Sequence, residues 1–174
     1  MTVLFKGKPA ELVGPDLKVG DKAPDFTLIS SDLQPVHLDD VTAHGTKNAL
    51  LIVVPSLDTS VCSIESNKFN ARLAELPPDI TAYIVSRDTP FAQLRWAKEQ
   101  GDVKLQFLSD ISDRDFGAAY GVLLKDVGLL ARAVFIVGKD KTIRYKQVVP
   151  DVGREPDYDD VIAAAFKSSS AVNV

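Results

Sequence analysis

The sequence of 174 residues is poor in cysteine, since Cys62 is the only one. A lone cysteine cannot form an internal disulfide, which fits a reducing compartment. Histidine is nearly as scarce, and the two histidines, His37 and His44, lie in a loop-like region without a partner motif. Because metal sites need several ligands at short spacings, we expect no bound metal. We expect both histidines at the surface.

Long hydrophobic runs and basic runs are also missing. The longest apolar run, ALLIVV at 49–54, is far shorter than the roughly 18 residues that suggest a membrane-spanning helix. The first 20 residues contain no apolar stretch of signal-peptide length. No basic run exceeds two residues, and a net charge of −4 with a pI near 5.1 argues against a nucleic-acid partner. These absences predict a cytoplasmic protein that binds neither membrane nor nucleic acid.

The residues that are present predict one α/β domain over 1–174. Hydrophobic residues make up 45% of the chain and charged residues 25%, as is ordinary for a globular protein. Apolar runs of strand length alternate with segments of helical periodicity, which predicts a central sheet flanked by helices. The predicted strands are 25–30, 48–54, 80–86, 131–138 and 142–149, and the predicted helices are 59–76, 91–101 and 157–167, with at best a short one in 114–121.

The two ends of the chain refine this prediction. Short β-prone pieces around the sequence GKP at 7–9 predict a hairpin over about 1–14. In the strand 142–149, Ile143, Tyr145, Gln147 and Val149 alternate with a second set, so we expect one face to be wet. The hairpin and this strand favour a mixed sheet over a purely parallel one. The tail at 168–174 is expected to fray.

The surroundings of Cys62 set it apart from an ordinary buried cysteine. The strand before it runs into Pro55, and a helix is predicted to begin at Thr59 as N-cap, which makes Cys62 the third helical residue. Unpaired N–H groups of the first turn would then face the thiol and favour the thiolate. Open α/β sheets commonly carry their chemistry beyond the carboxyl end of such a strand. These residues alone support a nucleophile and a buried structural thiol about equally.

Several separate stretches resemble one known family. PSLDTSVC at 55–62 matches the peroxiredoxin pattern of proline, three residues, threonine, two residues and cysteine. Four further stretches resemble motifs of the bacterial thiol peroxidase subfamily in the same order: VGDKAPDFTL at 19–28, SRDTPFAQLRW at 86–96, LLARAVFIVG at 129–138 and EPDYDDVIAA at 155–164. The resemblance covers nearly the whole chain and implies a thioredoxin-like fold.

The resemblance implies a role for each of four residues. Cys62 would attack the O–O bond of a peroxide and become a sulfenic acid. Thr59 would hydrogen-bond the thiolate and the peroxide, Pro55 would shield the thiolate from water, and Arg132 would stabilise thiolate and transition state. Taken singly, Thr59 is better explained as an N-cap, Pro55 as a strand stop and Arg132 as a surface charge at a strand end, but their shared order and spacing favour the roles that the resemblance implies. The family's reaction needs no metal or organic cofactor. The resemblance also implies a homodimer whose interface lies near SRDTPFAQ at 86–93.

The chain departs from the subfamily at Ala97, where most members carry a second, resolving cysteine, and in a minor way at Ser60. Ala97 is either natural or engineered. Without a second cysteine the sulfenic acid must be reduced by an external thiol, from a thioredoxin-like protein or a small molecule. Three functions remain open: a thiol peroxidase for hydrogen peroxide or alkyl hydroperoxides in antioxidant defence, a peroxide sensor acting by mixed disulfide, and an inactive interaction module. The complete set of four motif residues favours the peroxidase.

Overall fold

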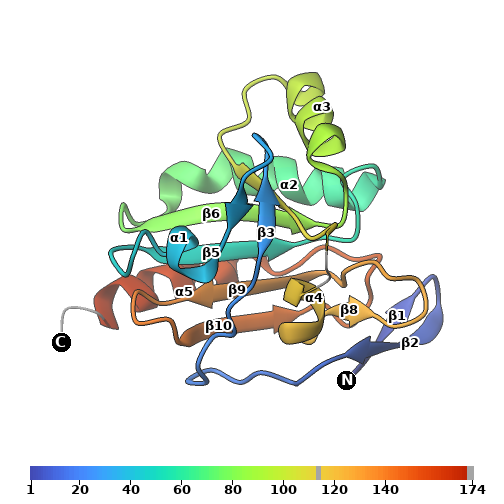
Figure 1. Ribbon diagram of the computed structural model, residues 1–174, viewed down its shortest axis with the longest axis horizontal. Coiled ribbons are helices and arrows are strands. Elements are labelled where there is room, and N and C mark those ends of the chain that lie inside the picture. The colour runs from blue at the N-terminus through green and yellow to red at the C-terminus, as the bar shows by residue number, and fades with distance from the viewer. Residues whose placement is uncertain (113–114, 172–174) are drawn as a thin grey trace.

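A seven-stranded sheet forms the centre of the computed structural model, which describes residues 1–112 and 115–171 (Figure 1). From edge to edge its strands are β10 (Ile143–Val148), β9 (Ala133–Val137), β5 (Asn48–Val53), β6 (Ile80–Ser86), β7 (Gln106–Ser109), β3 (Leu28–Ser30) and β4 (Pro35–Val36). The pairs β5–β6 and β6–β7 are parallel, and the other neighbours are antiparallel. The prediction of a central mixed sheet is confirmed.

Strand β5 is buried on both of its faces, which explains its continuous apolar sequence. All six of its residues are buried. Leu51 and Val53 pack in one hydrophobic cluster, whereas Leu50 and Ile52 pack in the other, on the opposite side of the sheet. A strand covered on both faces needs apolar side chains at every position, so its sequence shows no alternation.

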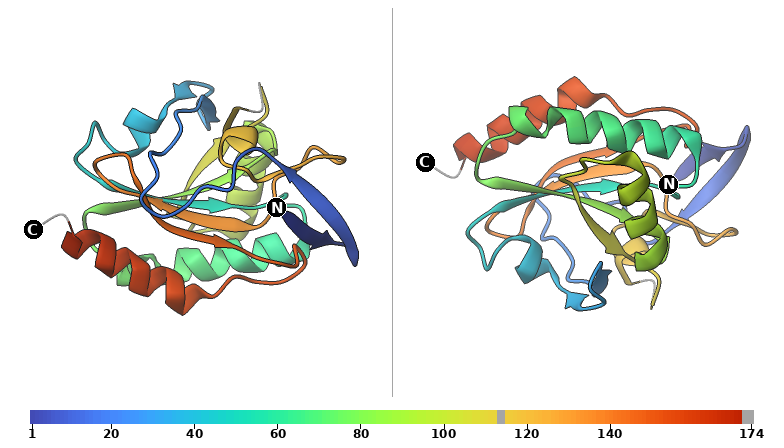
Figure 2. Two further views of the ribbon diagram at one scale, coloured as in Figure 1. Left: turned by 90° about the horizontal axis from the view of Figure 1, so that it is seen from below. Right: turned by 90° about the horizontal axis from the view of Figure 1, so that it is seen from above.

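Helices cover both faces of the sheet. On one face, α2 (Ser60–Arg72), which continues into a 3₁₀ turn (Leu73–Glu75), lies beside α5 (Tyr158–Ala171) (Figure 2). The opposite face carries α1 (Leu38–Val41) and α4 (Asp115–Ala119). The remaining helix, α3 (Pro90–Gln100), packs beside β7. We call the side with α2 and α5 the helix face and the side with α1 and α4 the aromatic face.

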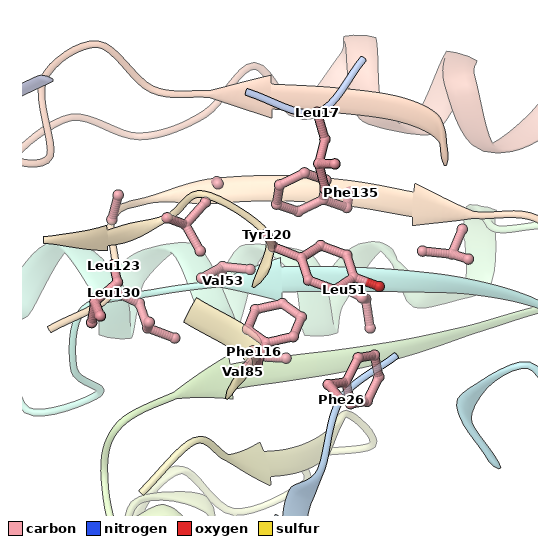
Figure 3. Close-up of a cluster of buried hydrophobic side chains, with 14 of the residues drawn as sticks. Leu17, Phe26, Leu51, Val53, Val85, Phe116, Tyr120, Leu123, Leu130 and Phe135 are labelled. Carbon is pink, nitrogen blue, oxygen red and sulfur yellow. The ribbon is translucent and has the colours of Figure 1, made fainter. Parts of the chain in front are cut away.

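The aromatic face is filled by a cluster of rings (Figure 3). Tyr120 stacks on Phe116 with centroids 4.5 Å apart, and it meets Phe26 and Phe135 edge-on at 6.0 and 5.3 Å. Its hydroxyl donates to the carbonyl oxygen of Pro24 at 2.8 Å. These contacts fasten the irregular segment before β3 onto the sheet.

The N-terminal hairpin is confirmed. Strand β1 (Thr2–Phe5) pairs antiparallel with β2 (Lys8–Val13). Lys6 and Gly7 form the turn with φ of 50° and 79°, and a two-residue turn with positive φ and glycine second matches the twist of a hairpin. Because β2 also pairs with β8 (Leu123–Leu124), the hairpin belongs to a separate three-stranded sheet.

Strand β10 corrects one prediction. Its register against β9 shifts between Ile143 and Tyr145, and a bulge of this kind adds one residue to a strand. Ile143 therefore packs on the aromatic face, whereas Tyr145 packs on the helix face. The alternation in the sequence predicted Ile143 and Tyr145 on the same face of the strand, and that prediction is wrong. No residue of β10 is fully exposed, so the expected wet face is only half exposed.

Helix α5 corrects a second prediction, because it continues to Ala171. Ser168 Oγ donates to the carbonyl oxygen of Ala164, and Ser169 Oγ donates to Asp79 Oδ1, both at 2.8 Å. Residues 168–171 thus belong to a helix that the sequence analysis ended at 167, while 172–174 lie outside the described residues. Within the described part of the chain, no helix has the length and apolar character needed to cross a membrane.

Candidate active site

The loop between β5 and α2 carries three of the predicted site residues. Pro55 is buried where the chain leaves the sheet. Thr59 is the N-cap of α2, with extended backbone at φ −87° and ψ 148°. Its Oγ1 accepts from the backbone N–H of Cys62 at 3.3 Å, so one of the orphan donors of the first turn is satisfied by the side chain. The predicted N-cap, and Cys62 as third residue of the helix, are confirmed.

The hydroxyl of Thr59 has a defined direction. It donates to the carbonyl oxygen of Ser56 at 3.0 Å, and the backbone N–H of Thr59 donates to the same oxygen at 3.2 Å. A hydroxyl has one proton and two lone pairs. The proton points at Ser56, and one lone pair accepts from Cys62 N–H. The second lone pair remains, so the hydroxyl can accept one more hydrogen bond but cannot donate another.

Cys62 has no exposed surface and belongs to the cluster on the helix face. Arg132 reaches it from the residue just before β9 and is only 2% exposed. Burial lowers the pKa of this guanidinium, but the neighbouring Glu65 carboxylate and the Cys62 side chain together outweigh burial and raise the pKa above its ordinary value. The structure therefore places Arg132 beside the sulfur, and the alternative of a surface charge at a strand end is wrong.

Glu65 completes the site and was missed by the sequence analysis. Its Oε2 accepts from Arg132 Nη1 at 2.5 Å, while Arg132 Nε donates to the carbonyl oxygen of Val152 at 2.8 Å. Glu65 Oε1 has no partner among residues 1–112 and 115–171. The available signal was its spacing, because a residue three positions after Cys62 lies on the same side of the helix.

Burial raises the pKa of Glu65 to about 7, since removing a carboxylate from water disfavours its charged form. Arg132 acts in the opposite direction, and the more distant Glu155 adds to the rise. A carboxyl group that titrates near neutrality, hydrogen-bonded to the cation of the site, sets the local charge. Whatever the charge of Glu65, the Cys62 thiol thus lies beside the Arg132 guanidinium and the amide groups of the first turn of α2.

Helix α3 packs against the start of α2. Trp96 Nε1 donates to Ser63 Oγ at 3.1 Å, next to Cys62, and Ala97 is half buried beside the same cluster. The two histidines are exposed as expected, at the N-cap of α1 and beside Asp39. Among the described residues, no three His, Cys, Asp or Glu side chains gather into a group that could hold a metal ion.

Comparisons with known proteins agree along nearly the whole chain. Residues 18–162 match the family model described as Redoxin. A thiol peroxidase of Halalkalibacterium halodurans is 44% identical over 94% of this chain and 96% of its own length, and one of Listeria innocua is 45% identical over 95% and 98%. Among solved structures, a peroxiredoxin-like protein from Aquifex aeolicus superposes with a TM-score of 0.87 at 40% identity, covering 95% of this chain and 96% of that one.

A more distant structure supports the fold alone. The thiol peroxidase from Chromobacterium violaceum is 18% identical, yet it superposes with a TM-score of 0.85 over 97% of this chain and 98% of its own. The expected thioredoxin-like arrangement with an N-terminal hairpin is thereby confirmed. The extent of the family match and the identity to the curated relatives decide the assignment. The chain belongs to the redoxin family, and within it to the peroxiredoxins of the bacterial thiol peroxidase subfamily.

Proposed function

We propose that this chain is a thiol-dependent peroxidase that reduces hydrogen peroxide and alkyl hydroperoxides through Cys62. The observation that carries the proposal is the position of the Cys62 thiol, in the first turn of α2 and beside the buried Arg132 guanidinium. Both features favour a negatively charged sulfur and a negatively charged leaving oxygen. The relatives named thiol peroxidase support the same activity.

The first half-reaction oxidises the cysteine. The Cys62 thiolate attacks one peroxide oxygen, so an S–O bond forms while the O–O bond breaks. The second oxygen leaves with the bonding electron pair and takes up a proton, giving water or an alcohol, and the cysteine becomes a sulfenic acid. Arg132 and the free amides of α2 stabilise the negative charge as it passes from sulfur to the leaving oxygen.

Thr59 would orient the peroxide. Its hydroxyl proton is engaged by Ser56, so it can accept a hydrogen bond but not donate a second one. The hydroperoxide O–H is a donor that fits this vacant lone pair. We propose that this bond aligns the O–O axis with the sulfur, and that buried Pro55 helps to keep water from the thiolate.

The second half-reaction needs an external thiol, because Ala97 occupies the place of a resolving cysteine. A thiol attacks the sulfenic sulfur and water leaves, which gives a mixed disulfide, and a second thiol then releases Cys62 as a thiol. The reductant would be a thioredoxin-like protein or a low-molecular-weight thiol in the cytoplasm. The lone cysteine also suits the second candidate, a peroxide sensor whose mixed disulfide with a partner protein is its output.

Peroxide consumption tests the proposed function. Wild-type protein with excess dithiothreitol should consume many equivalents of cumene hydroperoxide, measured against the same mixture without protein. Consumption of a single equivalent followed by arrest would favour the sensor. Absence of any reaction, with Cys62 still a free thiol by intact-mass spectrometry, would contradict both.

We also propose a homodimer with its interface at the start of α3. Phe91 is 69% exposed and Leu94 40% exposed, whereas Trp96 of the same helix is buried at 4%. Large apolar side chains that project in this way are typical of protein interfaces. Sedimentation at micromolar concentration should give a dimer for wild type and a monomer for Phe91→Glu. A monomeric wild type would contradict the proposal.

A further inference from the structure

Asp88 binds the loop between β5 and α2 from a segment more than 30 residues further along the chain. It lies just after β6, and its Oδ1 accepts from Ser56 Oγ at 2.7 Å. Its Oδ2 accepts from the backbone N–H of Leu57 at 2.9 Å. Both carboxylate oxygens thus bind the residues that directly follow Pro55. Hydrogen bonds to a charged acceptor are among the stronger ones in proteins.

The bond from Asp88 to Ser56 continues to the reactive cysteine. The carbonyl oxygen of Ser56 accepts from the Thr59 hydroxyl and from its backbone N–H. The same hydroxyl accepts from Cys62 N–H. Displacement of Ser56 would therefore turn the Thr59 hydroxyl and loosen the first turn of α2. The hydrogen bonds of the Asp88 carboxylate go to Ser56, Leu57 and Ser86, so its connection to Cys62 runs through Ser56 and Thr59.

Asp88 is itself held firmly. Ser86 Oγ donates to its Oδ2 at 2.7 Å, and Ser109 Oγ donates to its carbonyl oxygen at 2.5 Å. The buried Gln93 fixes Ser86 in turn, because its Nε2 donates to Ser86 Oγ at 3.1 Å and to the carbonyl oxygen of Leu108 at 3.0 Å. Hydrogen bonds therefore connect Asp88 to β6, β7 and α3.

The two half-reactions make opposite demands on this loop. Oxidation needs the closed arrangement, in which Arg132, the Thr59 hydroxyl and the sulfur are together. Reduction needs an external thiol, a larger molecule than hydrogen peroxide, to reach a sulfur that has no exposed surface in the closed state. Since the chain has no second cysteine, every turnover requires both states.

We propose that Asp88 is a positioning residue that holds the Ser56–Cys62 loop closed, and so favours oxidation of Cys62 and opposes access of the external thiol. The proposal rests on the proposed peroxidase function of Cys62. Asp88 acts through Ser56 and Thr59, and it sets how much of the time the loop is open.

Asp88→Asn tests this with each half-reaction measured alone. Oxidation is followed by the fluorescence of Trp96, the only tryptophan, whose indole binds Ser63 beside Cys62. The amide has one acceptor oxygen and cannot accept from both Ser56 and Leu57, so oxidation by hydrogen peroxide should slow at least tenfold. Reduction of the preformed sulfenic acid by dithiothreitol should proceed at least as fast as in wild type. If both rates equal those of wild type, or if both fall together, the proposal is wrong.

Asp79→Asn is the matched control. Asp79 immediately precedes β6, at the other end of the strand, and binds Ser169 Oγ at 2.8 Å and Lys139 Nζ at 3.1 Å. Asp79→Asn thus weakens a comparable pair of hydrogen bonds that do not involve the Ser56–Cys62 loop. Both half-reaction rates should stay within twofold of wild type. Ser56→Ala removes the bond to Asp88 Oδ1 and the longer bond, 3.2 Å, that Ser56 Oγ accepts from the backbone N–H of Asp58. It keeps the bond from Leu57 N–H to Asp88 and should slow oxidation less than Asp88→Asn. In the double variant the two effects should be less than additive, and full additivity would contradict the pathway through Ser56.

Amide hydrogen exchange decides the proposal independently of the thiol chemistry. Asp88→Asn should increase exchange in a peptide covering 56–62 at least fivefold relative to wild type, while Asp79→Asn should leave that peptide unchanged. Unchanged exchange in Asp88→Asn overturns the role of Asp88 even if the enzyme turns over normally. A wild-type protein that does not react with peroxide contradicts the proposed function, and the exchange result still decides what holds the loop.

Discussion

Each side of the central sheet carries a buried hydrophobic cluster, but the two sides hold different chemistry. The aromatic face is filled with rings, and the Tyr120 hydroxyl that donates to Pro24 ties a loop to them. The helix face has a similar hydrocarbon core, but it encloses a thiol, a carboxyl group and a guanidinium at Cys62, Glu65 and Arg132. Burying such groups costs free energy unless partners compensate them.

This difference assigns stability and reactivity to opposite sides of one sheet. A residue of the aromatic face contributes dispersion and hydrophobic burial, so its substitution should change the free energy of unfolding and leave the reaction alone. A residue of the polar group on the helix face is held at some expense of stability, so its substitution should either change the reaction, as expected for Cys62 and Arg132, or remove that expense, as expected for Glu65. Four substitutions test this division.

Cys62→Ser should have the largest effect. A serine hydroxyl stays protonated at neutral pH and cannot replace the thiolate, so the second-order rate with peroxide should fall at least about a thousandfold, or about 4 kcal/mol. The change removes little volume, and the melting temperature should stay within a few degrees of wild type. Stopped-flow fluorescence of Trp96 and calorimetry measure the two quantities. Retained peroxidase activity would remove Cys62 from the mechanism.

Glu65→Gln should reveal the stability cost of the buried carboxyl. Its pKa is raised in the folded state to about 7, so folding favours the protonated form. This contribution to stability is complete below the ordinary carboxyl pKa and is lost as the pH rises through about 7. It amounts to about 3 kcal/mol.

The measurement for Glu65 is a series of urea unfolding curves between pH 4.5 and pH 8. The free energy of unfolding of wild type should fall relative to Glu65→Gln across this range. Glu75→Gln is the control, because Arg72 pairs with Glu75 at the surface and lowers its pKa. Parallel curves for wild type and Glu65→Gln would show that Glu65 does not titrate in this range.

Arg132→Met should slow the reaction with peroxide at least tenfold, about 1.4 kcal/mol of transition-state stabilisation. The methionine fills part of the space but supplies no charge for the leaving oxygen. Without the cation, Glu65 should remain protonated at neutral pH, so the fold should survive. Arg72→Met, at the end of α2, where Arg72 pairs with Glu75 and Asp159, is the control and should react at the wild-type rate. A normal rate in a folded Arg132→Met would exclude Arg132 from catalysis.

Local features of the sequence were enough to predict the start of the reactive helix and the buried strands. Thr59 acts on an amide three residues away, and β5 has apolar residues on both faces, so neither depends on distant parts of the chain. The role expected for Arg132 came from family resemblance. Its burial beside Cys62 depends on a contact across 67 residues to Glu65, which no local pattern encodes.

The errors have the same physical origin. A glutamate in a helix is usually solvated, so the spacing of Glu65 from Cys62 was not enough to predict its burial without the contact to Arg132. The bulge in β10 reverses the alternation after Ile143, and only the pairing with β9 reveals it. The end of α5 is stabilised by Asp79, 90 residues before Ser169. In each case a tertiary contact overrode a correct local rule.

Tyr120→Phe should have the smallest effect and tests the aromatic face alone. The phenyl ring keeps the stacking on Phe116, so the core stays filled, but the carbonyl oxygen of Pro24 loses its donor. One such hydrogen bond is worth about 1 kcal/mol, and the rate with peroxide should be unchanged. Tyr145→Phe is the control, because its hydroxyl donates to Asp160 at the surface, where water can replace it, and should cost less. Unfolding curves and the stopped-flow rate measure both quantities. A lower rate in Tyr120→Phe at normal stability would show that the aromatic face takes part in the reaction, and the division between the two faces would fail.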